Sequence, residues 1–191
     1  MLPIARRALE ALWGRADRAA TRDCSGACRV HFSVSGFSDY LEIRTLEEKE
    51  AFHAEMNVAA RVGALHIEWD HRAGAQGAIK YLELLSFPSL TELLGKRATT
   101  QKLVDACERL APWMERRANL QKLIASWEAL KSPRGVGVDF VHEVVDACRL
   151  LEQCERQQFS DVSQRRVSTR LFGDSKRIER LGTVLDLLTA P

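Results

Sequence analysis

The sequence lacks most of the features that mark specialised classes of protein. It holds five cysteines, an odd number, and it shows no internal repeat or low-complexity tract. No apolar run approaches the ~20 residues needed to span a bilayer. Apolar residues make up 46% of the chain, which is the balance of a globular protein rather than a disordered one. We therefore expect a reduced, soluble, cytoplasmic protein without a membrane partner.

The sequence also has little net charge. A formal charge of +2 does not by itself indicate a nucleic-acid binder, because electrostatic binding depends on where Lys and Arg cluster. The first 22 residues hold five arginines on an amphipathic pattern, which also occurs in mitochondrial transit peptides. The acidic residues Glu10 and Asp17 argue against a transit peptide. The case for a nucleic-acid partner depends on local clusters of Lys and Arg elsewhere in the chain.

Motifs of known enzyme classes are missing as well. The sequence has no nucleophile elbow, phosphate-binding loop or metal-binding His-Glu pair. Cys24, Cys28 and His31 offer three potential metal ligands, but no fourth ligand follows at zinc-finger spacing, which favours ordinary packing. Glu68 and Asp70 resemble half of a nuclease site, yet no paired acidic motif follows them. We expect no catalytic residue, metal or cofactor in this chain.

What the sequence does contain is a mixed α+β pattern over residues 1–96. Alternating and helical apolar spacings predict these elements in order: a helix at 3–20, strands at 29–34 and 40–44, a helix at 46–62, a hairpin of strands at 65–70 and 78–85, and a helix at 88–94. Thr45 and Glu48 form a capping box at the start of the 46–62 helix, and Gly63 and Gly95 can end their helices in left-handed conformations.

The remainder, residues 97–191, reads as a helical unit. We expect helices at 100–111, 113–130 and 138–157, separated by Pro112 and by a Pro-Gly turn at 132–135. A short extended piece at 166–172 and a final helix at 174–188 complete it. The expected fold class is therefore α+β, mostly α.

A helix followed at once by a β-hairpin is the order of a winged helix, in which the helix enters the major groove and the hairpin contacts phosphates. On the 46–62 helix, Asn57 and Arg61 are the candidate donors to DNA. His71 and Arg72, at the tip of the hairpin, are candidate phosphate contacts. The alternative is a solvated surface, because three glutamates near the start of this helix would repel phosphate.

The clearest positive patch lies between residues 165 and 180. It contains six basic residues against two acidic ones, which is a local excess of four. Its members are Arg165, Arg166, Arg170, Lys176, Arg177 and Arg180. The first five are candidate DNA contacts, and the alternative is again a plain exposed surface.

Two stretches resemble a known family. They are residues 63–70 (GALHIEWD) and residues 166–179 (RVSTRLFGDSKRIE), and the second is the more specific. They resemble the N-terminal region of JetD proteins, the Toprim nuclease subunits of Wadjet bacterial defence systems, in which an SMC-type motor complex recognises plasmid DNA. The resemblance covers most of the chain, but residues 1–45 match less clearly.

The resemblance implies a DNA-engaging and dimer-forming arm, which acts on double-stranded DNA together with SMC-type motor subunits. The acidic, metal-binding residues of the family's Toprim domain cannot be placed on any position of this sequence, so cutting activity is not implied for this chain. The alternative is a protein-interaction module, in which the apolar faces of the helices at 113–130 and 138–157 form a dimer or dock on the motor.

Overall fold

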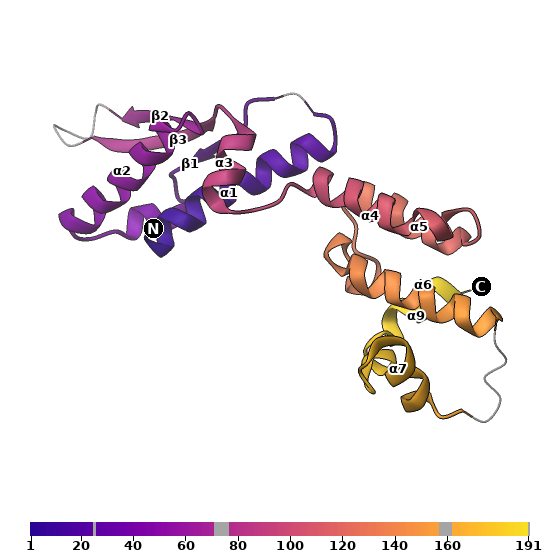
Figure 1. Ribbon diagram of the computed structural model, residues 1–191. Coiled ribbons are helices and arrows are strands. Elements are labelled where there is room, and N and C mark those ends of the chain that lie inside the picture. Colours follow the sequence, from indigo (N-terminus) through magenta and orange to yellow (C-terminus); the bar gives the residue numbers. More distant parts are fainter. Residues whose placement is uncertain (25, 71–76, 157–161, 191) are drawn as a thin grey trace. The chain divides into compact units, whose positions relative to one another are not determined.

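The fold is α+β and mostly helical (Figure 1). The computed structural model describes residues 1–24, 26–70, 77–156 and 162–190. The chain divides into two compact units, Met1–Thr100 (unit 1) and Gln101–Pro191 (unit 2), where the sequence predicted a boundary after residue 96. Each unit buries its own apolar residues.

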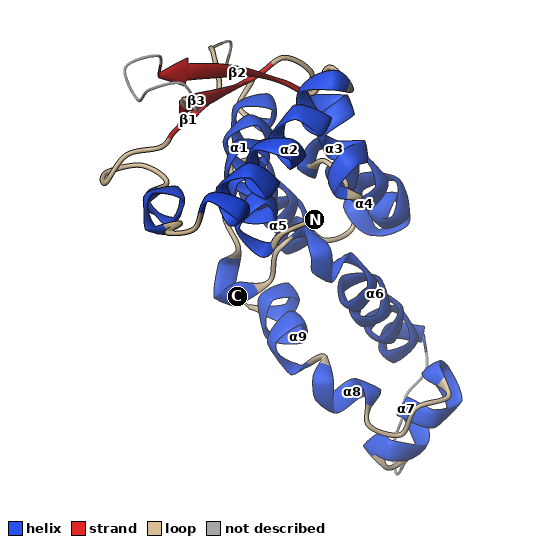
Figure 2. Ribbon diagram, turned by 90° about the vertical axis from the view of Figure 1, so that its left-hand side faces the viewer, coloured by secondary structure: helices blue, strands red, loops and turns tan. Residues whose placement is uncertain are grey.

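Unit 1 combines a small antiparallel sheet with helices on one side of it. Its elements are α1 (Pro3–Thr21), β1 (Arg29–His31), the 3-10 helix η1 (Ser38–Glu42), α2 (Leu46–Arg61), β2 (Leu65–Asp70), β3 (Ala78–Leu84) and α3 (Phe87–Leu94). The strand order is β1-β3-β2, with Val30 and Ile67 both opposite Leu82. These three side chains are buried under α1 and α2, which lie on the same side of the sheet in both views (Figures 1 and 2).

The helix boundaries in unit 1 follow the expected capping chemistry. The Glu48 amide donates to Thr45 Oγ1 at 3.3 Å at the start of α2. Ser86 caps α3 in the same way, and Gly95 ends that helix with a φ of 60°, a conformation that glycine adopts without steric cost. The predicted helices at 46–62 and 88–94 and the predicted hairpin strands are confirmed.

The strand predicted at 40–44 is wrong, because this segment forms η1 instead. The reason is a pair of tertiary contacts. The Ile79 amide donates to the Tyr40 hydroxyl at 3.0 Å, and the centroids of the Tyr40 and Phe32 rings lie 4.7 Å apart. The tight turn of η1 places the Tyr40 side chain in the core, where this residue is 4% exposed. The first strand is also shorter than predicted and ends at His31.

A buried carboxylate anchors the end of unit 1. Asp17, on α1, is only 7% exposed. Its two oxygens accept from the Thr99 amide at 2.8 Å and from the Thr99 hydroxyl at 2.6 Å. Because Thr99 is the first residue of helix α4 (Thr99–Met114), Asp17 satisfies an amide that the helix itself leaves unpaired.

We expect Asp17→Ala to lower the free energy of unfolding by about 1–3 kcal/mol, because it leaves two partly buried donors of Thr99 without an acceptor. Chemical denaturation of the variant beside wild type measures the change. Glu92→Ala removes an exposed carboxylate from the same unit and serves as the control, with a change within about 0.5 kcal/mol. Equal effects of the two substitutions would contradict the anchoring role.

Unit 2 contains most of α4 together with five further helices. They are α5 (Ala118–Glu128), α6 (Val141–Arg156), α7 (Gln164–Phe172), α8 (Arg177–Arg180) and α9 (Gly182–Thr189), with short 3-10 turns η3 (Pro133–Gly135) and η4 (Val138–Phe140). Apolar side chains of α4, α5, α6 and α9 form its main core. Within it, Trp127 is 2% exposed and its indole N–H donates to the Val136 carbonyl at 2.9 Å.

Three predictions in unit 2 are wrong. Residues 166–172 are not extended but belong to α7, where Val167 and Leu171, four residues apart, both face the small third cluster of apolar residues. The predicted helix at 174–188 is divided into α8 and α9. Pro112 does not separate two helices, because α4 continues past it for two residues to Met114.

Candidate nucleic-acid interface

The residues predicted to contact DNA fall into two groups on different units. Asn57 and Arg61 lie exposed on α2, while the remaining basic candidates belong to α7, α8 and the turn between them. His71 and Arg72 lie outside the described residues.

The α2 surface is a poor match to DNA. Glu47, Glu48 and Glu50 are all exposed near the start of this helix, so a phosphate approaching it meets three carboxylates. Arg61 lies in the last turn, where a cation is favourable for the helix itself. A role in helix stability therefore accounts for Arg61 without a ligand.

His53, which shares the polar side of α2 with Asn57 and Arg61, is already engaged. The Tyr40 hydroxyl accepts from the Ile79 amide at 3.0 Å and forms a second hydrogen bond with His53 Nε2, 2.8 Å away. The His53 ring also packs edge-on against Trp69, with the ring centroids 5.0 Å apart. The imidazole is therefore held by contacts within unit 1.

This arrangement makes unit 1 sensitive to acid. Burial of the His53 ring, reinforced by the nearby Lys49 charge, lowers the pKa of His53. The unfolded chain then binds this proton more readily than the folded one, so stability is lost as the pH falls below the unfolded value of about 6.5. We expect denaturation at pH ~5.5 and ~7.5 to show a larger acid loss for wild type than for His53→Gln; equal losses would contradict the argument.

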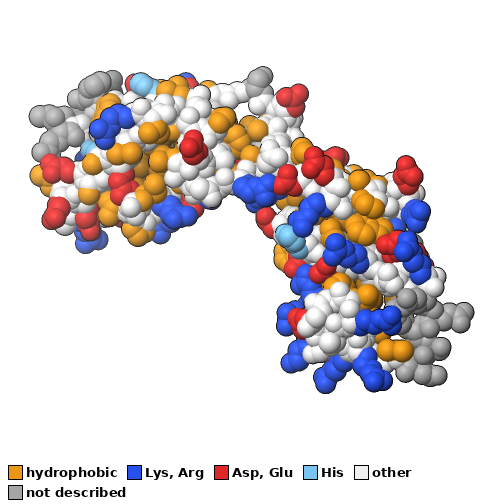
Figure 3. All heavy atoms as spheres, viewed as in Figure 1, with side chains coloured by type: hydrophobic (Ala, Val, Ile, Leu, Met, Phe, Trp, Pro, Cys, Tyr) orange, Lys and Arg blue, Asp and Glu red, His pale blue; other side chains and the backbone are white. Residues whose placement is uncertain are grey.

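The α7 surface has a different electrostatic character. The helix carries Arg165, Arg166 and Arg170 and no acidic residue (sequence QRRVSTRLF). Figure 3 shows Lys and Arg side chains gathered over the part of the surface that Figure 1 labels α7. This is where the sequence placed the strongest positive patch.

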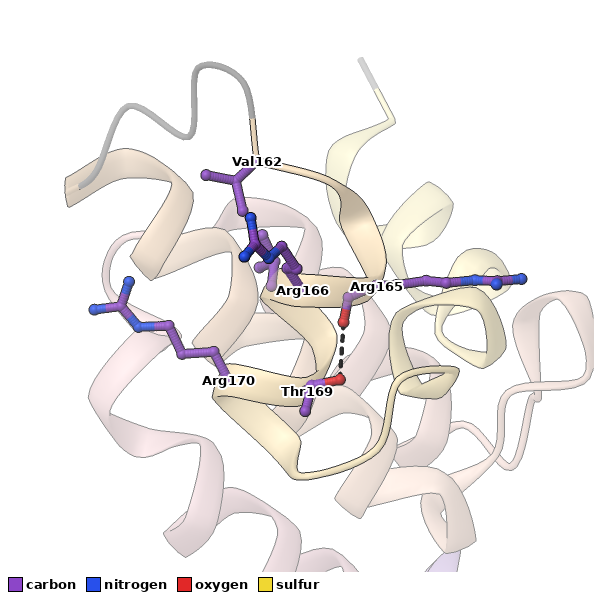
Figure 4. Close-up of a pocket in the computed structure, with 6 residues that line it drawn as sticks. Val162, Arg165, Arg166, Thr169 and Arg170 are labelled. Carbon is purple, nitrogen blue, oxygen red and sulfur yellow. Dashed lines mark hydrogen bonds between the residues drawn. The ribbon is translucent and has the colours of Figure 1, made fainter.

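Arg166 and Arg170 form the free part of this patch. They are one helical turn apart, both exposed, and in Figure 4 both lie on the same side of α7, while Arg165 extends to the opposite side. Among the residues that the structure describes, neither has an ion-pair partner. Arg165 differs, because its guanidinium lies 3.8 Å from a Glu179 carboxylate oxygen.

The basic residues in the first turn of α7 oppose the dipole of the helix, whereas Arg170, in its last turn, suits it. Arg165 and Arg166 lie in its first turn, near the positive end of the helix dipole, where a cation is unfavourable by about 0.3–1 kcal/mol. Like charges four residues apart, as at Arg166 and Arg170, cost a further ~0.2–0.5 kcal/mol. An anion bound across the pair would remove both penalties.

A shallow hollow of about 590 Å³ adjoins the two arginines. Val162 and Val167 contribute apolar surface to it, and Arg165, Arg166, Thr169 and Arg170 complete its lining (Figure 4). The Thr169 hydroxyl donates to the Arg165 carbonyl at 3.0 Å, which directs this side chain along the helix. Val162 and Thr169 were not predicted as site residues, because nothing in the local sequence marks an isolated valine or threonine as part of a basic surface.

Lys176 adds an exposed ammonium group at the turn between α7 and α8, and no ion pair engages it within the described part of the chain. Arg180, in contrast, pairs with Asp174 at 3.1 Å. Among the described residues, the cations without an ion pair at this end of unit 2 are thus Arg166, Arg170 and Lys176.

Arg177, which was also predicted as a phosphate contact, forms ion pairs within unit 2. Its side chain is 21% exposed and reaches α6, where it lies 2.7 Å from Asp146 Oδ2 and 3.3 Å from Glu143 Oε1. Two carboxylates therefore already neutralise this guanidinium. The sequence did not indicate this pairing, because the partners lie 31 and 34 residues away along the chain.

No three His, Cys, Asp or Glu side chains gather as metal ligands within residues 1–24, 26–70, 77–156 and 162–190. Cys148 is buried in the main core of unit 2, and burial raises the pKa of its thiol to about 11, so it stays protonated at neutral pH. It packs as a small apolar side chain.

No helix within the described ranges combines the length and apolar character needed to cross a bilayer. Comparison with known proteins finds no match to this chain among protein-family models, curated sequences or solved structures.

Proposed function

We propose that the surface of α7 binds the phosphate backbone of double-stranded DNA. The observation that carries this proposal is the exposed pair Arg166 and Arg170, for which the described residues offer no acidic partner. Arg166 also lies in the first turn of its helix, where the helix dipole disfavours a cation. Guanidinium groups make short, strong hydrogen bonds to phosphate oxygens. Lys176, in the turn between α7 and α8, adds a third exposed cation.

This surface suits contacts that hold DNA rather than read its sequence. Base recognition depends largely on amide and bidentate arginine contacts within the grooves, whereas cations on an exposed helix bind phosphates of any sequence. Thr169 is the one other polar side chain that lines the adjoining hollow. We therefore propose that the contact is independent of base sequence.

The family resemblance supplies a setting for this activity. We propose that the chain serves as the DNA-holding arm of a Wadjet-type defence nuclease. Its proposed partners are a second copy of itself, with which it forms a homodimer, and SMC-type motor subunits. The order α1, β1, η1, α2, β2, β3 supports a winged-helix-like unit 1, in which η1 takes the place of a middle helix. The acidic start of α2 makes unit 1 the weaker candidate for DNA contact.

The alternative, a protein-interaction module, was expected to use the apolar faces of the helices at 113–130 and 138–157. The apolar residues of α5 and α6 pack inside unit 2, where Leu120, Ile124 and Val144 are each no more than 4% exposed. These faces are used in the core, so DNA contact is the better-supported function.

Fluorescence anisotropy with a labelled duplex tests the proposal. Three free cations predict a slope of log K against log salt of about −3, or ~40-fold weaker binding between about 50 and about 200 mM salt. Two duplexes of unrelated sequence are expected to bind equally. Absence of binding at low salt would reject the function, and binding without salt dependence would reject the α7 cations as its source.

A further inference from the structure

The basic helix α7 has few apolar contacts with which to hold its position. Within the described residues, the cluster beneath it contains three buried side chains, Leu150, Val167 and Ile178, with Leu171, Phe172 and Leu185 partly buried beside them. The main core of unit 2 is a separate cluster. We therefore expect polar contacts to contribute much of the free energy that holds α7 in its orientation.

One set of polar contacts joins α7 to the turn that follows it. Ser168, on α7, is completely buried; its hydroxyl donates to the Asp174 carbonyl at 2.5 Å and accepts from the Ile178 amide at 3.2 Å. Asp174 Oδ1 in turn accepts from the Lys176 amide at 2.9 Å. Residues 173–178 are thus held as a defined turn against α7.

A second set joins this turn to α6 through Arg177. Its Nε donates to Asp146 Oδ2 at 2.8 Å, its Nη2 lies 2.7 Å from the same oxygen, and its Nη1 lies 3.3 Å from Glu143 Oε1. The planar guanidinium can donate to both carboxylates at once, which a lysine ammonium at the end of a flexible chain does less well. Arg177 is the residue that ties the turn, and with it α7, to a long helix of unit 2.

We infer that Arg177 is a positioning residue for the α7 surface: it makes no contact with DNA but fixes the direction in which Arg166 and Arg170 point. This inference rests on the proposed function, because positioning Arg166 and Arg170 matters only if they bind DNA. The contacts to Glu143 and Asp146 carry it, because a guanidinium held by two carboxylates has little positive charge left for phosphate.

The salt dependence of DNA binding separates a positioning residue from a contact residue. Removing a phosphate contact reduces the slope of log K against log salt by about 1. Misplacing an intact set of cations lowers the affinity but removes no cation, so the slope changes little. We expect Arg177→Gln to weaken binding with a slope close to that of wild type. The matched contact variant, Arg166→Gln, is expected to lower the slope by about 1.

Exchanging the charges provides a second test. The double variant Arg177→Asp with Asp146→Arg restores an ion pair between the same elements, and we expect it to recover most of the affinity that Arg177→Gln loses. A slope that falls by about 1 in Arg177→Gln, without recovery in the double variant, would show that Arg177 contacts phosphate and would overturn the inference.

Amide hydrogen exchange without DNA keeps this inference distinct from the proposed function. We expect Arg177→Gln to speed exchange of the α7 amides while the α5 amides keep their protection. If wild type fails to bind DNA, the proposed function is rejected and this exchange measurement still decides the positioning role. Unchanged α7 exchange in Arg177→Gln would overturn the inference whatever the DNA result.

Discussion

Replacing Arg166 and Arg170 together with glutamate is expected to weaken duplex binding by at least ~100-fold at moderate salt. Each hydrogen bond to a charged group contributes about 1.5–3 kcal/mol, so the loss of two accounts for that factor before the repulsion of two new carboxylates is added. Both side chains are exposed, so the substitutions leave the fold intact. Anisotropy titration of a labelled duplex measures the change.

The chain offers a matched control for this experiment. Arg18 and Arg22 are also exposed and four residues apart, at the end of α1, and their replacement by glutamate changes the net charge by the same amount. We expect the control variant to bind DNA within a few-fold of wild type. A loss as large as that of the α7 variant would show that binding follows total charge rather than this surface.

Truncation of Phe52 to alanine is expected to have the largest effect on stability. Its ring is completely buried in unit 1, with centroids 5.8 Å from Phe32 and 5.2 Å from Tyr40. Replacing a buried Phe by Ala costs about 3–5 kcal/mol, because the transfer free energy is lost and a cavity is left. Such a loss is large beside the ~5–15 kcal/mol stability of a typical domain.

Because unit 1 and unit 2 have separate cores, the Phe52→Ala effect is expected to stay within unit 1. Hydrogen exchange should show lost protection in β2 and β3 while α5 and α6 keep theirs. Equal loss of protection in both units would mean that the chain unfolds as one cooperative block, contrary to the division into two cores.

Local signals in the sequence predicted much of unit 1 correctly. The Thr45–Glu48 capping box, the alternation at residues 65–70 and the glycine at 95 each depend on neighbours a few residues away. Such features determine helix ends and hairpins before any tertiary contact forms. The helix at 3–20 was predictable for the same reason, since its apolar stripe repeats at helical spacing.

The errors occurred where a distant residue decides the structure. Tyr40 looked like part of a strand, but its hydroxyl is bound to the Ile79 amide, which comes 39 residues later. Residues 166–172 were predicted to be extended, yet the helix places three arginines outside and three apolar residues, Val167, Leu171 and Phe172, against the small cluster. No local pattern contains these partners.

The candidate site was found by charge, but its internal organisation was not. Counting cations located residues 165–180 and the exposed pair Arg166 and Arg170. The same count grouped them with Arg177, whose charge is neutralised by Asp146 and Glu143. A sequence lists charges, whereas only a fold shows which of them are already paired.

The most direct test of the central proposal compares the salt dependence of duplex binding for wild type, Arg166→Gln with Arg170→Gln, and Arg18→Gln with Arg22→Gln. The proposal predicts slopes of about −3 for wild type and the α1 variant, and about −1 for the α7 variant, since each lost phosphate contact lowers the slope by about 1. The same slope for all three proteins would contradict DNA binding through α7.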